Sequence, residues 1–557
     1  MPKRIGLVTY ETPFAPCGGI AAVMSRLPGA LDRATKCPVG VITPYHRHIA
    51  PTTAARAEMD PVATVRVTRG PMGLDVDILR HPGRAGYAVP HYFVAPRDHS
   101  SFAGARHPYD VPAHELLEDA LLFGVAVARA TEAIAPGAQW LLMVHDWEAA
   151  TAALAAQRDT HRVLLTLHNS YDCGVTDAQL AHHGIDAATC PGETVLQRVL
   201  GLPNVAGPVS TVSTQFAADL TEDVLQARIM APHLQHLLRP RLRGIENGLF
   251  VERQVPDDCV AAMRRGDYQP FANWKHGRRA EALAQLDRLV PTETLPVWGD
   301  RRRFDRDSRA AWFVLAGRDD PRQKGYEVAA AAVTRFLESG GDARFVFFPM
   351  PGDLGLGALS FLMRLACRFP DRVLVMPFRW TDGYLAALQG GTYGVMPSLY
   401  EPFGMANEFY LNGLAAVGRA TGGLLQQIVP FRTARCFTPA VQWRADRWSQ
   451  PATPPTGLLC REPDDESAAE AWRELNAIED DRADPTYDRA HARRTLPLIN
   501  AMARALATAF DDAVTVYRNQ PTLYYEMVRE GLAHVERTFS WERSSREYLK
   551  AADALDW

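Results

Sequence analysis

The sequence predicts an α/β fold with two doubly wound, Rossmann-like domains, and three observations support this prediction. Short apolar runs alternate with helix-length stretches along the whole chain of 557 residues. The runs are continuous rather than alternating, which is typical of parallel strands buried on both faces. A polar, proline-containing stretch at 250–308 interrupts the pattern. Because one hydrophobic core rarely serves so long a chain, this stretch marks the boundary between two halves.

The expected strands follow one another at regular intervals, and helical stretches such as 115–134 and 327–338 lie between them. This order of strands and helices favours parallel sheets. We therefore expect domains at 1–250 and 311–530, a connection at 251–310 and a final helix at 531–557. The expected strands are 5–10, 140–144, 163–167, 209–212, 312–316, 345–348, 373–376, 394–396 and 415–417.

Composition excludes several classes of protein. Lys and Arg number 60 against 64 Asp and Glu, which argues against a nucleic-acid surface built on bulk positive charge. The eight cysteines form no C-x-x-C pair, so neither a zinc ribbon nor a redox dithiol is predicted. No apolar run approaches about 18 residues, the length of a membrane span. We therefore expect a cytoplasmic protein that binds neither membrane nor nucleic acid.

Polar and glycine residues gather directly after the expected strands. Ligands of doubly wound sheets bind beyond the carboxyl ends of the strands, so these residues are the candidates for a site. They are Gly18 and Gly19 after the first strand, His145 and His168 after the next two, Arg318 and Lys324 after 312–316, Glu401, Gly404 and Met405 after 394–396, and Thr421, Gly422 and Gly423 after 415–417.

Such a set of residues suits an anionic ligand. Glycines let the backbone approach a ligand closely, and the first N–H groups of a helix bind phosphate. Arg318 and Lys324 would add two positive charges. Each feature also has a plainer interpretation: a Gly-Gly pair also makes a tight strand-to-helix turn, and a single Arg or Lys is commonly a solvated surface charge. The spacing matches neither a P-loop nor a dinucleotide-binding fingerprint.

An ordered series of segments resembles the motifs of starch synthases and bacterial glycogen synthases. The segments span residues 10 to 549 and so cover nearly the whole chain. They are 10–27, His145-Asp146-Trp147, Thr166-Leu167-His168-Asn169, Thr211-Val212-Ser213, Gly244-Ile245-Glu246-Asn247-Gly248, Gly317-Arg318 with Gln323-Lys324-Gly325, 396–404, Arg419-Ala420-Thr421-Gly422-Gly423-Leu424, and Phe539-Ser540-Trp541 with Tyr548-Leu549. The six-residue step from Arg318 to Lys324 and the run 345–351 are similar to animal and fungal glycogen synthases.

The resemblance implies a GT-B fold, in which two Rossmann-like domains face each other across a cleft and the final helix returns to the first domain. It implies a retaining glycosyltransferase that moves a glucosyl unit from ADP-glucose or UDP-glucose to an α-1,4-glucan or oligosaccharide. Arg318 and Lys324 would neutralise the phosphates, Glu401 would hold the donor sugar, and His168 would position it near its 6-hydroxyl. The remaining implied binding residues are Gly18, Gly19, His145, Asn247, Gly404, Met405, Thr421, Gly422 and Gly423. No D-x-D element is evident, so neither a metal nor a cofactor is expected.

Two departures from the family pattern keep other functions open. Pro16 stands where the family has a phosphate-binding lysine, and Glu408 lies seven rather than eight positions after Glu401. The alternatives are a retaining transferase with a small-molecule acceptor and a catalytically weak GT-B protein that binds glucan or regulates a partner. The sequence does not choose between ADP and UDP, and it leaves a homo-oligomer open.

Overall fold

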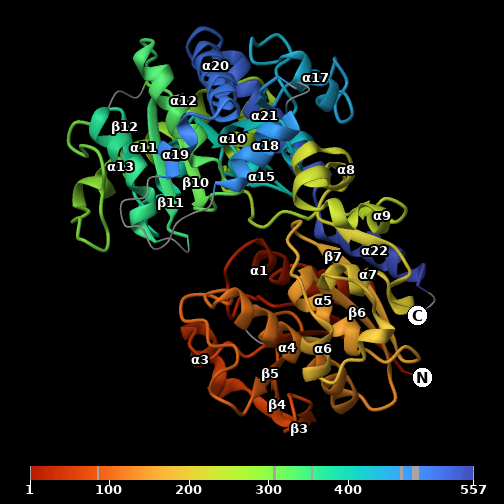
Figure 1. Cartoon of the computed structure of the whole chain (residues 1–557). Coiled ribbons are helices and arrows are strands. Elements are labelled where there is room, and N and C mark those ends of the chain that lie inside the picture. Colours follow the sequence, from red (N-terminus) through yellow and green to blue (C-terminus); the bar gives the residue numbers. More distant parts are fainter. Residues whose placement is uncertain are drawn as a thin grey trace. The chain divides into compact units, whose positions relative to one another are not determined.

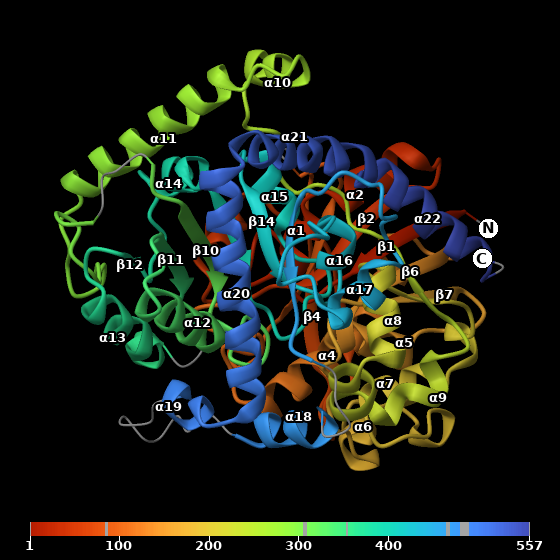
Figure 2. The same cartoon turned by 90° about the horizontal axis from the view of Figure 1, so that it is seen from above.

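The computed structural model describes residues 2–83, 87–304, 309–352, 355–463, 468–478, 489–555 and 557. The chain divides into two compact units, which Figures 1 and 2 show in the colours of the sequence. Unit 1 comprises Met1–Phe250 and Phe539–Trp557, and unit 2 comprises Val251–Thr538. Each unit has its own sheet, and the helices of that unit pack against it.

Unit 1 contains a nine-stranded sheet in the order β3-β4-β5-β2-β1-β6-β7-β8-β9. Every pairing from β5 to β9 is parallel, whereas β3 and β4 extend the sheet in antiparallel fashion. The strands are β1 Lys3–Val8, β2 Val39–Pro44, β3 Asp60–Val67, β4 Leu74–His81, β5 His91–Pro96, β6 Gln139–His145, β7 His161–Leu167, β8 Val209–Thr211 and β9 Leu242–Gly244.

The antiparallel extension was not predicted from the sequence, and its burial explains why. Strand β3 alternates exposed and partly buried residues, as an edge strand with one solvated face does. Continuous apolar runs, which marked the parallel strands, are therefore absent there. The buried strand β2 also escaped prediction, although all six of its residues are buried.

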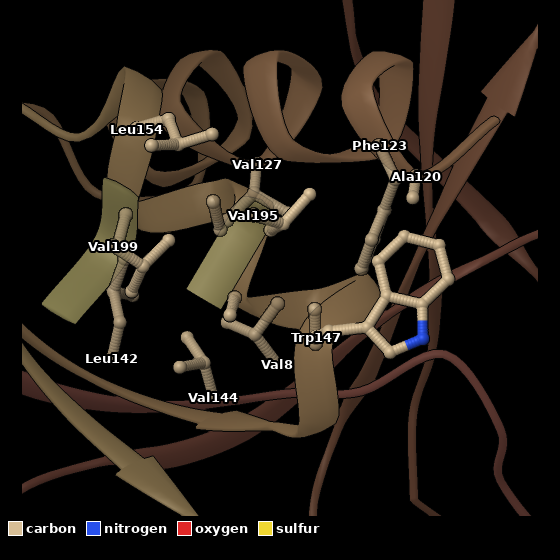
Figure 3. Packing of buried hydrophobic residues seen from close by; sticks show 14 of the residues in the cluster. Val8, Ala120, Phe123, Val127, Leu142, Val144, Trp147, Leu154, Val195 and Val199 are labelled. Atoms are coloured by element: carbon tan, nitrogen blue, oxygen red, sulfur yellow. The ribbon is translucent and has the colours of Figure 1, made fainter. Parts of the chain in front are cut away.

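The helices of unit 1 enclose its core. In Figure 3, Val8 and Val144 from the sheet lie below Phe123 and Val127 of α4 and beside Trp147 of α5. Burial of such side chains contributes about 1.5–3 kcal/mol each. The buried Trp147 therefore holds the start of α5 against this core. The helices are α1 Gly19–Met24, α2 Leu27–Ala34, α3 Ala50–Ala55, α4 Ala113–Ile134, α5 Asp146–Ala155, α6 Asp177–His182, α7 Val195–Leu200, α8 Thr214–Glu222, a π-helix at Val224–Met230, α9 Gln235–Leu238 and α22 Trp541–Asp553.

Unit 2 contains a six-stranded, wholly parallel sheet in the order β12-β11-β10-β13-β14-β15. Numbered from its own first strand, this is the Rossmann order 3-2-1-4-5-6, in which the strand order reverses between β10 and β13. Ligands of this fold bind at that reversal. The strands are β10 Trp312–Arg318, β11 Arg344–Met350, β12 Val373–Val375, β13 Tyr393–Met396, β14 Ala415–Arg419 and β15 Gly457–Cys460.

Helices cover the sheet of unit 2, with α20 packed along α12 and α11 packed against α14 (Figure 2). The segment expected to be a connection, 251–310, holds α10 and α11 and lies within unit 2. The helices are α10 Asp257–Arg264, α11 Gln269–Arg288, α12 Tyr326–Glu338, α13 Ser360–Arg368, α14 Tyr384–Gly390, α15 Ala406–Leu411, α16 Leu424–Gln427, α17 Pro439–Ala445, α18 Ala468–Ala477, α19 Arg489–Arg494, α20 Pro497–Asn519 and α21 Pro521–Thr538.

The C-terminal helix α22 belongs to unit 1. It begins after Ser540, whose hydroxyl caps the helix by accepting from the Arg543 N–H at 3.2 Å. The Trp541 indole donates to the Leu249 carbonyl at 2.8 Å, and α22 packs against α2. The sequence placed the return at 531, whereas α21 continues to Thr538 within unit 2. Within the described ranges, we find no helix whose length and apolar character suit a membrane crossing.

The predicted fold class is confirmed. Both units contain Rossmann-like sheets of mainly parallel strands, and each strand expected from the sequence overlaps a strand of the structure. The expectation that the two domains face each other across a cleft stays a prediction.

Candidate active site

The ion pair between Lys324 and Glu401 is the centre of the candidate site in unit 2. The Lys324 ammonium donates to Glu401 Oε2 at 2.9 Å, and the Ser398 hydroxyl donates to the same oxygen at 2.9 Å. The Gln323 amide donates to Oε1 at 3.2 Å. Glu401 is buried while the Lys324 side chain is one-quarter exposed, so the carboxylate is held in a fixed orientation and the cation remains reachable.

Backbone geometry brings these two residues together from neighbouring strands. Lys324 follows β10 and Glu401 follows β13, and these are the two neighbouring strands between which the strand order reverses. The Leu399 N–H donates to the Gln323 carbonyl at 2.7 Å and joins the two loops. Gly325, with φ +65°, begins α12 so close to the other loop that a Cβ there would lie 2.3 Å from the Pro397 carbonyl oxygen. Glycine is therefore required at this position.

The glycines after β14 support Glu401 from below. A Cβ on Gly422 would lie 1.6 Å from the Glu401 carbonyl oxygen, and the Gly423 N–H donates to that oxygen at 3.0 Å. Gly404, with φ +91°, turns the chain just beyond Glu401. Thr421 is buried beside this turn, and the Met405 N–H approaches the Met396 sulfur at 3.3 Å. These residues were expected to bind the donor, and the backbone of Gly422 and Gly423 packs directly against that of Glu401.

Arg419, which ends β14, forms a second buried ion pair. Its guanidinium makes two bonds to the Glu462 carboxylate, one of them at 2.9 Å, and donates to the Leu399 carbonyl at 2.6 Å. Burial alone would raise the pKa of Glu462, but the charges of Arg419 and Arg461 hold this pKa below its usual value. Arg419 thus ties the Glu401 loop to the neighbouring strand.

Arg318 and Glu408 complete the candidate residues of unit 2. Arg318 is the last residue of β10 and is partly buried. Glu408 lies in the first turn of α15. Burial raises the pKa of Glu408 to about 7, with a further increase from Glu401 and an opposing effect from Lys324. The shift places Glu408 within the electrostatic reach of the Lys324–Glu401 pair.

In unit 1, His145 and His168 contact each other at the carboxyl ends of β6 and β7. His145 Nδ1 and His168 Nε2 lie 2.8 Å apart, a hydrogen-bond distance. His145 is fully buried, whereas His168 is partly exposed. Burial lowers the pKa of His168 to about 3 and that of His145 well below its usual value. Both rings are therefore neutral at physiological pH.

Asp146 holds the backbone beside this pair. Its carboxylate accepts the His168 N–H at 2.5 Å and the Asn169 side-chain amide at 2.8 Å. Asp146 has φ +61°, an unusual conformation for a residue with a side chain, which marks a strained turn between β6 and α5. Burial raises its pKa to about 7.

Glu11 occupies the glycine loop that follows β1. Its carboxylate oxygen Oε2 accepts the N–H groups of Cys17 and Gly18 at 2.7 Å each. Gly18 was expected to bind the donor, and its N–H donates to this carboxylate of the chain itself. Gly19 begins α1, and a Cβ at this position would meet no atom within 4 Å, so its neighbourhood is open.

Asn247 and Glu148 are two further buried polar residues of unit 1. Asn247 donates its backbone N–H to the Val212 carbonyl at 3.2 Å, but its side-chain oxygen has no hydrogen-bond partner among the described residues. Glu148 lies in the first turn of α5, two positions after Asp146. Burial and the charges of Asp146, Glu11 and Asp172 raise the pKa of Glu148 well above its usual value.

The structure brings one pair of predicted residues into contact in each unit. His145 and His168 touch in unit 1, while Lys324 contacts Glu401 in unit 2. Sequence reasoning missed four contributors: Ser398, Gln323, Glu11 and Glu148. The first three lie inside quoted motifs or directly before them, so their positions were the available signal. Groups of three or more side chains suited to a metal ion are absent from the described residues.

Comparisons with known proteins agree with this architecture. Residues 4–239 match the family described as the starch synthase catalytic domain. Glycogen synthase 2 of Agrobacterium fabrum is 28% identical over 445 residues, covering 76% of this chain and 79% of that protein. Glycogen synthase of Kosmotoga olearia is 24% identical over 447 residues, covering 77% of this chain and 84% of that protein.

Solved structures give the same fold. The catalytic domain of starch synthase IV from Arabidopsis thaliana, bound to ADP and acarbose, superimposes with a TM-score of 0.68 at 16% identity and full coverage of both chains. Sucrose-phosphate synthase from Thermosynechococcus elongatus gives 0.53 at 18% identity, covering 100% of this chain and 99% of that one. The match over the whole length confirms the predicted pair of Rossmann-like units of the GT-B fold.

Proposed function

We propose, from the premise that this chain is a glycosyltransferase related to the starch and glycogen synthases, that it transfers a glucosyl unit to an α-1,4-glucan with retention of configuration. The donor is a nucleotide diphosphate glucose, with ADP or UDP as the nucleotide. The acceptor is a glucan or oligosaccharide, and we place the reaction in the cytoplasm.

The Lys324–Glu401 pair is the observation that supports this proposal most directly. It lies at the strand reversal of unit 2, where ligands of this fold bind. Cleavage of the donor puts negative charge on the diphosphate and positive charge on the sugar. A fixed cation beside a fixed carboxylate matches this separation of charge, and such preorganised groups are usually the largest catalytic contribution.

Lys324 acts on the leaving group. Its ammonium has three N–H groups, of which one donates to Glu401 and the others remain for phosphate oxygens. Arg318, at the end of β10, adds a second positive charge. Charge-assisted hydrogen bonds contribute about 1.5–3 kcal/mol each. If they strengthen as the phosphate departs, two such bonds supply roughly two to four decades of rate.

Glu401 and His168 act on the sugar. Three donors hold the Glu401 carboxylate, and its remaining lone pairs are available to sugar hydroxyls and to the positive charge that develops on the ring. His168 offers a neutral ring at the carboxyl end of β7. A neutral imidazole binds a hydroxyl without repelling a cationic ring. Gly422 and Gly423 keep Glu401 in register.

Nucleotide release tests the proposal. The protein is incubated with ADP-glucose or UDP-glucose, each without acceptor, with glycogen or with a small sugar, and free nucleotide is measured. We expect release that depends on glycogen with at least one donor. Release with a small sugar but not with glycogen would favour the small-acceptor alternative. No release with either donor, whatever acceptor is added, would favour the catalytically weak binding protein.

Lys324→Ala tests the site itself. We expect turnover to fall by roughly a hundredfold or more, the scale of losing one charge-stabilising group. Arg368→Ala is the matched control, because Arg368 also forms an ion pair in unit 2, with Glu338, but on an exposed surface. An unchanged rate in Lys324→Ala would remove Lys324 from the site.

A further inference from the structure

The contact between His145 and His168 has a consequence for the position of a proton. We propose that His145 is a positioning residue, which fixes the ring proton of His168 on Nδ1 and so makes His168 present an N–H donor to the sugar. This inference rests on the proposed function. His145 is itself fully buried, so it acts on the substrate through His168.

The first step is the count of protons between the rings. His145 Nδ1 and His168 Nε2 lie 2.8 Å apart, and the ring planes are tilted by 41°. A neutral imidazole carries one N–H and one lone pair. A hydrogen bond between two neutral rings therefore requires one nitrogen to donate and the other to accept.

The second step decides which ring donates. His145 Nε2 is buried and has no hydrogen-bond partner among the described residues. Orphaned N–H groups are rarer in protein interiors than acceptors with an unused lone pair. The favoured arrangement thus leaves the lone pair on His145 Nε2 and the proton on Nδ1. His145 then donates to His168 Nε2, and the proton of His168 resides on Nδ1.

The third step separates the ring from the backbone. The His168 backbone N–H is held by the Asp146 carboxylate, independently of the ring. His145 is the one described residue that forms a side-chain hydrogen bond with the His168 ring. Replacing His145 therefore changes the tautomer of His168 while its backbone stays anchored. His168 is partly exposed, so its second nitrogen is reachable by a ligand.

The chemical result is a defined hydrogen-bond polarity at the sugar. With the proton on Nδ1, His168 donates to a hydroxyl oxygen of the donor sugar. The opposite tautomer would present a lone pair instead and would require the hydroxyl to donate. A fixed tautomer removes this choice, as neighbours of other functional histidines do.

Two substitutions at His145 test the inference. In His145→Asn the amide N–H stands close to the position of Nδ1 and keeps the donor, whereas His145→Leu removes it. We expect kcat/KM to fall about tenfold in His145→Leu, the scale of one hydrogen bond, and to stay within threefold in His145→Asn. His161→Asn is the matched control: His161 is also a buried histidine of unit 1, bonded to Thr131 at 2.9 Å, at the opposite end of β7.

A spectroscopic measurement makes the result independent of activity. Nitrogen-15 spectra of ring-labelled histidine distinguish a protonated from an unprotonated ring nitrogen, and His168→Gln identifies the His168 signals. We expect protonated Nδ1 and unprotonated Nε2 in the wild type and in His145→Asn, and a mixture of tautomers in His145→Leu. Protonated Nε2 in the wild type, or an unchanged tautomer in His145→Leu, would overturn the inference. If neither donor is turned over while the expected tautomer is found, the proposed function fails and the positioning of the proton stands.

Discussion

The candidate residues of unit 1 and those of unit 2 differ in whether burial leaves them charged or neutral. In unit 2, Lys324 pairs with Glu401 and Arg419 pairs with Glu462, so that these two buried carboxylates each meet a cation. In unit 1, burial raises the pKa of Asp146 and lowers that of His168, and each shift favours the neutral form. These residues of unit 2 are charged and paired, whereas in unit 1 burial favours uncharged side chains.

This difference agrees with the roles proposed for the two sets of residues. In the proposed reaction, a diphosphate needs fixed positive charge, which Lys324 and Arg318 of unit 2 would supply. Hydroxyl groups of a neutral sugar need donors and acceptors without net charge, which buried neutral histidines and carboxyls supply. Two kinds of substitution test this comparison: one removes a charge from a buried ion pair, and the other removes a charge from an exposed ion pair.

The largest expected effect is the loss of the Arg419–Glu462 pair. Glu462→Ala leaves a buried guanidinium without its carboxylate. Breaking a buried pair on one side costs about 3–5 kcal/mol, so we expect a loss of this size in the free energy of unfolding of unit 2. Chemical denaturation followed by tryptophan fluorescence measures it.

An exposed pair of the same unit provides the control. Glu338→Ala breaks the contact with Arg368, whose side chain is 58% exposed, and should cost less than about 1 kcal/mol. Equal losses in the two variants would show that burial does not set the strength of charge pairing in unit 2, and the comparison would lose its basis.

Most strands of unit 2 and the two residues of its central ion pair could be predicted from the sequence, because a continuous apolar run marks each of these strands and polar residues follow it. Parallel strands buried on both faces appear as continuous apolar runs, and Lys324 and Glu401 stand directly after two of them. The motif order then identified both residues. In unit 1, the edge hairpin β3–β4 alternates polar and apolar residues and carries no such run.

Contacts that depend on three-dimensional proximity were beyond the sequence. The hydrogen bond of His145 to His168 joins residues 23 positions apart on different strands. The bonds from Glu11 to the glycine loop depend on how the loop curls back. Glu148 directly follows the segment His145-Asp146-Trp147 and lies outside the quoted motifs, so its burial among other carboxyls gave no signal in the sequence.

Neutral carboxyls in unit 1 should reveal themselves in the dependence of stability on pH. Asp119 of α4 is buried, accepts the Phe102 N–H at 2.9 Å, and has a pKa raised by burial from 3.8 to about 7. Because the folded state binds this proton more tightly, its stabilising effect is present below pH 3.8 and is lost as pH rises to about 7. The loss is up to about 4 kcal/mol. Asp119→Asn should remove this slope.

Asp110 gives a control of opposite sign. The Arg106 side chain lowers the pKa of Asp110, so its contribution is present above the unfolded pKa and is lost as pH falls through the folded one. Asp110→Asn should therefore reduce stability at neutral pH and leave the slope between pH 4 and 7 unchanged. If Asp119→Asn has the same slope as the wild type, Asp119 is not a neutral buried acid.

The smallest expected effect concerns Glu148. Its carboxyl is buried, and burial together with the charges of Asp146, Glu11 and Asp172 raises its pKa well above the usual value and so favours the protonated form. Glutamine has the same size and also offers a donor and an acceptor, so Glu148→Gln should leave kcat/KM within about twofold of the wild type. Glu401→Gln makes the same chemical change in unit 2 but removes the charge that Lys324 pairs with. We expect kcat/KM to fall by about a hundredfold there.

Measuring both glutamine variants with the same donor and acceptor compares the two units directly. A loss above tenfold in Glu148→Gln would mean that Glu148 works as a charged carboxylate, and the buried residues of unit 1 would then not all be neutral. A loss below twofold in Glu401→Gln would mean that the negative charge of Glu401 contributes little to catalysis, so that its hydrogen bonds alone hold the sugar. Both substitutions replace a buried carboxyl by an amide, but Glu401 lies next to a cation and Glu148 lies among other carboxyls. We therefore expect catalysis to depend on the charge of Glu401 and not on that of Glu148.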